Sequence, residues 1–165
     1  MTDLVHKLLD FLTDIGIDAR EGIVPASSFL PGIVIAKGAL IFDRCSLRWP
    51  GDLLHEAGHI AVTPAAMRGA LDGAIGHPSG GPQGEDEVEA IAWSFAAITH
   101  LGVEPSVLFH ADGYKGQSAA LLLTYSVGVY PGVFGLAHAG MTMVGTDAKA
   151  AGLPPYPHMI RWLRA

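Results

Sequence analysis

The sequence predicts a small α+β domain in which a short β-sheet packs on helices. The first supporting observation is the order of its patterns: a helical period, two short β-branched runs, then helical periods. The second is the length of 165 residues, which suits one domain, so we expect a single domain over residues 1–165. The third is that half of the residues are hydrophobic, enough for a closed core.

The first half of the chain supplies the expected helix and strands. Leu4, Leu8 and Leu12 recur at helical spacing with charged residues on other faces, which is typical of an amphipathic helix. Residues 32–37 (GIVIAK) and 39–43 (ALIFD) are short runs joined through Gly38, and they suggest a β-hairpin.

Later elements are expected to be mainly helical. Asp52 can cap a helix that runs to about Val62, where a Thr-Pro pair ends it. A glycine- and proline-rich loop separates this helix from a second one, at residues 85–100. A short helix is expected near Pro157.

Residues 116–146 contain no Asp, Glu, Lys or Arg, which raises the question of a membrane span. Pro131 and several glycines interrupt the run, however, so two short buried helices separated at GVYPG are the better interpretation. The N-terminus lacks the pattern of a secretory signal, and Cys45 is the only cysteine, so we expect a cytoplasmic protein without a disulfide or thiolate cluster. The net charge of −6 argues against a nucleic-acid partner.

The motif His55-Glu56-Ala57-Gly58-His59 carries the main chemical signal. Residues four apart on a helix are neighbours on one face, so His55 and His59 can each direct a ring nitrogen at one zinc ion. Glu56 lies to the side of that face, where its carboxylate can act as general base on a zinc-bound water. Gly58 would let another segment approach beside the metal. The alternative is a helix with two surface histidines and a Glu56 that forms salt bridges.

A catalytic zinc usually has a third protein ligand, and the residues after His59 supply none. Three glutamates open the second helix: Glu85 and Glu89 share a face, and Glu87 is expected to point elsewhere. Glu89 lies past the first turn among apolar residues, where a carboxylate needs a partner. We therefore predict Glu89 as third ligand, with Glu85 as the alternative.

The segments ALIFDRCSLRWPGDLLHEAGHIAV and EVEAIAWSFAA resemble the ImmA/IrrE-like metallopeptidases, over residues 39–97. The resemblance implies a zincin-like fold of the gluzincin type with Zn²⁺ held by His55, His59 and Glu89. It implies Glu56 as catalytic base, and an edge strand at residues 39–43 that binds an extended peptide by strand addition.

The sequence therefore predicts a zinc metallopeptidase acting on a protein or peptide substrate, with no membrane partner and an undetermined oligomeric state. The alternative is a non-catalytic zinc-binding or protein-interaction domain with a degenerate zincin fold. A peptidase also needs a donor for the oxyanion of its reaction. The candidates that the sequence offers are Tyr114, Tyr125, Tyr130, His110 and His138.

Overall fold

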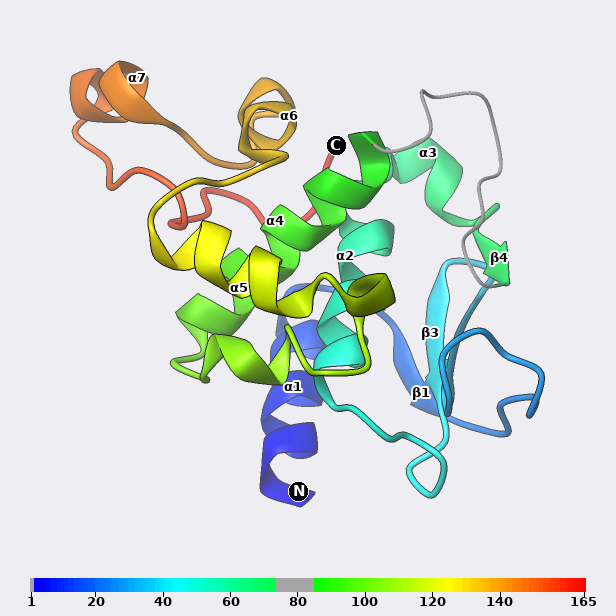
Figure 1. Cartoon of the computed structure of the whole chain (residues 1–165). Helices are drawn as coiled ribbons and strands as arrows, with labels where there is room; N and C mark the ends of the chain where they lie inside the picture. Colours follow the sequence, from blue (N-terminus) through cyan, green and yellow to red (C-terminus); the bar gives the residue numbers. More distant parts are fainter. Residues whose placement is uncertain (1, 74–84) are drawn as a thin grey trace.

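The computed structural model describes residues 2–73 and 85–165 and has an α+β architecture (Figure 1). Its elements, in chain order, are α1 (Thr2–Asp14), β1 (Ala19–Glu21), β2 (Ile33–Ala36), β3 (Ala39–Phe42), α2 (Gly51–Val62), α3 (Ala65–Arg68), β4 (Asp72–Gly73), α4 (Glu85–His100), the 3₁₀ turns η1 (Pro105–Val107) and η2 (Tyr114–Gly116), α5 (Ser118–Ser126), α6 (Val133–His138) and α7 (Gly145–Ala151).

Helices α2 and α4 pack against each other at the centre of the molecule, with the sheet on one side and α5 to α7 on the other (Figure 1). Gly58 of α2 makes this close approach possible. A Cβ atom there would lie 2.7 Å from the Ala90 carbonyl oxygen and 2.9 Å from Ser94 Oγ, both on α4. The prediction that Gly58 admits another segment is therefore confirmed.

The sheet has the strand order β1-β3-β2-β4. The predicted hairpin is confirmed: β2 and β3 pair antiparallel through a two-residue turn in which Lys37 (φ 51°) and Gly38 (φ 76°) are both left-handed. The expectation of an edge strand at residues 39–43 is wrong, because β3 also pairs in parallel with β1 and is therefore an inner strand. The edge positions belong to the short strands β1 and β4.

The amphipathic N-terminal helix is also confirmed. Leu8 and Leu12 of α1 are fully buried in the main core, and Phe11 adds an aromatic ring that contacts Trp93 and Trp162. Because Trp93 belongs to α4, this contact ties α1 to the central helix pair.

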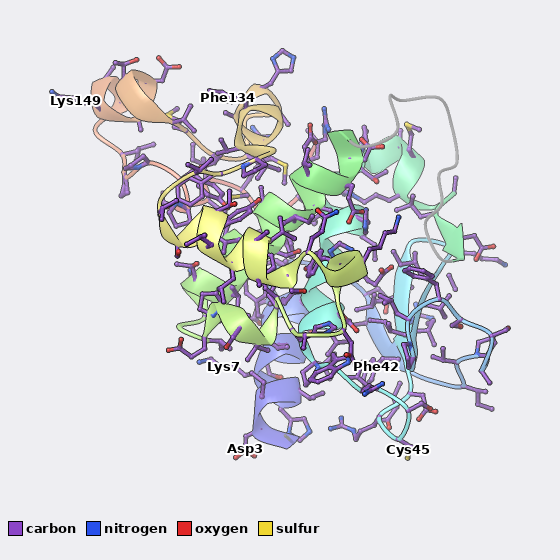
Figure 2. All side chains as sticks on the ribbon, in the orientation of Figure 1. Asp3, Lys7, Phe42, Cys45, Phe134 and Lys149 are labelled. Carbon is purple, nitrogen blue, oxygen red and sulfur yellow. The ribbon has the colours of Figure 1, made fainter. Side chains whose placement is uncertain are left out.

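The uncharged run at residues 116–146 forms two short helices, α5 and α6, as expected. They are only partly buried, since Leu123, Val127 and Phe134 are largely exposed; Figure 2 shows Phe134 on the outer side of α6. Within residues 2–73 and 85–165, none of the helices has the length and apolar character needed to cross a membrane.

The C-terminal segment contains no helix near Pro157, contrary to the sequence-based expectation. It runs instead along α4 to the C-terminal end of α2 (Figure 1). The Trp93 indole nitrogen donates to the Trp162 carbonyl oxygen at 2.8 Å, and the Arg164 amide donates to the Ala61 carbonyl oxygen at 2.9 Å. These bonds use backbone groups that a helix in this segment would need for its own hydrogen bonds.

Candidate metal centre

Three side chains from the two central helices form a compact group of potential metal ligands: His55, His59 and Glu87. One ligand atom from each lies within 4.8 Å of the others. His59 Nε2 is 3.2 Å from one Glu87 oxygen, and His55 Nε2 is 3.6 Å from the other. The two histidines therefore face the same carboxylate.

The local structure explains this convergence. His55 and His59 are one turn apart on α2, and their rings meet edge to face with centroids 4.9 Å apart. Glu87 lies in the first turn of α4, and the tight contact at Gly58 brings that helix against α2. Helix α2 is buried along most of its length, so the histidines are not a surface pair.

The structure places Glu87, and not the predicted Glu89, beside the two histidines. The Glu89 carboxylate lies 3.1 Å from Arg164 Nη1, and a Cβ atom at Gly135 of α6 would clash with it. This partly buried carboxylate does have a partner, as expected, and Arg164 is one that the structure shows. The side chain of Glu85, the alternative ligand, lies outside the described residues.

The protonation states of His55 and Glu87 suit metal ligands, whereas His59 would have to release a proton on binding a metal. Burial, followed by the neighbouring His59, lowers the pKa of His55 to about 4, so its ring is neutral at pH 7. Burial opposes protonation of His59, but its hydrogen bond to Glu87 and the charges of Glu56 and Glu87 raise its pKa. The hydrogen bond from His59 in turn lowers the pKa of Glu87, which favours the carboxylate.

Glu56 is buried on α2 next to His55 and is not part of the ligand group. Burial raises the pKa of Glu56 to about 7, and the charges of Asp52 and Glu87 add to this effect against the opposing charge of His59. Its carboxyl group can therefore exchange a proton near neutral pH.

A second buried pair flanks the group. His110 Nε2 lies 2.8 Å from Asp52 Oδ1, and the Trp49 ring stacks on the His110 ring at a centroid distance of 4.6 Å. The expectation that Asp52 caps α2 is wrong: Pro50 occupies the cap position, and Asp52 lies in the first turn. Burial raises the pKa of Asp52 despite the hydrogen bond to His110.

Tyr114 of η2 also lies next to the group. The sequence offered it as one of several candidate donors for the oxyanion. Its ring lies edge to face on His55 with centroids 5.2 Å apart. Its hydroxyl is buried and has no hydrogen-bond partner among the described residues. Burial, followed by the charges of Asp52 and Glu87, raises the pKa of Tyr114 well above its usual value.

The donor set fits a zinc ion. Two imidazoles and a carboxylate from separate helices are a common zinc-binding combination. Ligand atoms at tetrahedral angles and zinc distances of ~2.0–2.1 Å are about 3.3 Å apart, close to the 3.2 and 3.6 Å observed here. Cys45 is exposed on the loop after β3 and takes no part in the group (Figure 2).

No family model, curated protein or solved structure matches the chain. Function is therefore inferred from the residues of the site.

Proposed function

We propose that the chain is a zinc-dependent metallopeptidase in which His55, His59 and Glu87 bind the metal and Glu56 is the general base. The observation that carries this proposal is the convergence of the three side chains, with both histidine nitrogens at distances from the Glu87 oxygens that suit zinc ligands. The His-Glu-x-x-His pattern and its resemblance to the ImmA/IrrE-like metallopeptidases support it. The same proposal includes a zincin-like arrangement of this α+β fold.

A zinc ion bound there would lower the pKa of a coordinated water and polarise the carbonyl of a peptide bond. Glu56 accepts a proton as the water oxygen adds to the carbonyl carbon. It then passes that proton to the nitrogen as the carbon–nitrogen bond breaks. Atoms balance, because one water and one peptide bond yield a carboxyl and an amino group.

The roles of the three motif residues can be separated by mutation. Purified protein should contain close to one zinc per chain, and His55→Ala and His59→Ala should lose it. Glu56→Gln is expected to keep zinc but to abolish hydrolysis of an unfolded casein-like substrate. Loss of zinc from Glu56→Gln as well would show that the roles are misassigned.

A non-catalytic zinc-binding or protein-interaction domain is the second candidate. It is favoured by the exposed apolar side chains of α5 and α6, including Leu123 and Phe134, which could contact a partner. A zinc site closed by four protein ligands, together with no hydrolysis of unfolded protein, would support this candidate over a peptidase. The proposed substrate class remains a protein or peptide, and the proposed location remains the cytoplasm.

A further inference from the structure

The Tyr114 hydroxyl is a buried donor beside the ligand group with no acceptor among the described residues. A buried polar group without a hydrogen bond costs roughly 1–3 kcal/mol. Tyr114 and Lys115 also have left-handed backbone conformations, with φ of 53° and 54°, which are unfavourable for residues other than glycine. The fold therefore holds this side chain in place at an energetic cost.

The contacts of the preceding residues explain how Tyr114 is held. His110 is anchored to Asp52 on α2 by their hydrogen bond. Gly113 packs on the His110 ring so closely that a Cβ atom would lie 3.1 Å from His110 Cε1. The Tyr114 ring is then fixed between His55 and Phe109. The segment is thus tied to the first turn of the helix that carries the histidines.

The hydroxyl also differs from the other donors that the sequence offered. His110 uses Nε2 for its hydrogen bond to Asp52, and its Nδ1 is buried without a partner among the described residues, but no ring contact joins His110 to either histidine of the group. The Tyr125 hydroxyl donates to the Pro131 carbonyl oxygen at 2.9 Å. His138 is exposed on α6. Of these side chains, Tyr114 combines contact with a ligand histidine and a hydroxyl that is buried without a partner.

We propose that the Tyr114 hydroxyl donates a hydrogen bond to the oxyanion that forms on the substrate carbonyl carbon during hydrolysis. This inference rests on the proposed function. An oxyanion supplies the acceptor that the described residues do not provide, once substrate binding opens a path to the buried hydroxyl. A donor whose ring is already held beside His55 then needs little reorientation to stabilise the negative charge. Tyr114 would then be a catalytic residue that contacts the reacting group.

The competing role is structural. His55 Nδ1 is also buried without a partner among the described residues, so a small shift could let Tyr114 orient that ring instead. Partners that orient a metal ligand typically change metal affinity ~10–100-fold when they are lost. Zinc affinity therefore separates the two roles.

The test compares Tyr114→Phe with Tyr125→Phe, a matched control that loses a tyrosine hydroxyl engaged elsewhere. Zinc affinity is measured first by competition with a chromophoric chelator. Titration calorimetry on the zinc-loaded proteins then measures two inhibitors with the same dipeptide side chains. One is a phosphinic dipeptide, whose oxygens mimic the oxyanion, and the other is a mercaptoacyl dipeptide, which offers sulfur instead.

Tyr114→Phe should keep the zinc affinity, bind the phosphinic inhibitor about 10–100-fold more weakly and bind the thiol within twofold of wild type. Tyr125→Phe should change neither affinity. Equal weakening of both inhibitors, unchanged binding of both, or a loss of zinc affinity in Tyr114→Phe would each overturn the proposal. A wild-type protein that binds no zinc would instead overturn the proposed function itself.

Discussion

Replacing Glu87 with glutamine should weaken zinc binding, whereas the same replacement at Glu89 should leave it intact. Both changes convert a carboxylate on α4 into an amide of the same shape, so they form a matched pair. Glu87 is 3.2 Å from His59 Nε2 and belongs to the ligand group, while Glu89 forms an ion pair with Arg164.

The size of the effect follows from linkage between metal binding and folding. Free zinc at one hundred times its dissociation constant stabilises the folded chain by about 2.7 kcal/mol. A domain of this size gains roughly 2–4 °C in Tm per kcal/mol, so zinc should raise the Tm of the wild type by about 5–10 °C. If loss of the Glu87 charge lowers affinity ~100-fold, the same zinc concentration gives Glu87→Gln about 0.4 kcal/mol and a shift near 1 °C.

Glu89→Gln should behave differently. This change removes the negative charge that faces Arg164. The Glu89 side chain is 13% exposed and the Arg164 side chain is 29% exposed. Because the arginine remains partly solvated, we expect a cost of about 1–2 kcal/mol. The zinc-free protein should therefore melt several degrees lower, yet the zinc-dependent rise in Tm should match that of the wild type.

The assay is thermal unfolding followed by circular dichroism, in chelator and then with zinc at a buffered free concentration. The readout is the difference between the two Tm values for each protein, which cancels any change in the stability of the zinc-free form. A full zinc shift in Glu87→Gln together with a lost shift in Glu89→Gln would refute the assignment of the third ligand.

Two further changes test the packing around the site. Gly58→Ala places a methyl group 2.7 Å from the Ala90 carbonyl oxygen. Overpacking should destabilise the fold by about 1–3 kcal/mol, more than alanine gains in helix propensity. A Tm in chelator equal to or above that of the wild type would contradict this. His110→Ala should lower the free energy of unfolding by about 2–3 kcal/mol in urea denaturation, because it leaves Asp52 buried without its hydrogen bond. His138→Ala, at an exposed position, is the control, and an equal loss there would show that the buried pair is not responsible.

The sequence predicted that His55 and His59 face the same way because their relation is local. Spacing of four residues on a helix determines which side chains share a face, whatever the rest of the fold does. The presence of a helix at 52–62 followed from its pattern and its Thr-Pro stop, and the structure confirms its C-terminal end at Val62. Its predicted cap, Asp52, lies two residues after the observed cap, Pro50, and pairs instead with His110, 58 residues further along the chain.

The carboxylate of the group could not be predicted in the same way. Which of three glutamates faces α2 depends on the rotation and crossing of α4, and those are set by contacts such as Gly58 against Ala90. The competing partner of Glu89 is Arg164, 75 residues further along the chain. No local pattern links these two residues.

The same limit applies to the sheet. The hairpin of β2 and β3 was predictable from two short runs around Gly38, but its outer partners were not. The parallel pairing of Ala19–Glu21 with β3 is a long-range contact of a three-residue strand, too short to show a clear period. That pairing makes β3 an inner strand and removes it as a candidate for binding an extended peptide.

The most direct test of the central claim is a zinc-anomalous diffraction map from crystals of the zinc-loaded protein. We predict a single anomalous peak about 2.0–2.2 Å from His55 Nε2, His59 Nε2 and a Glu87 carboxylate oxygen, with one coordination position left to solvent. A peak coordinated by Glu89 in place of Glu87, or no peak between the two histidines, would contradict the account.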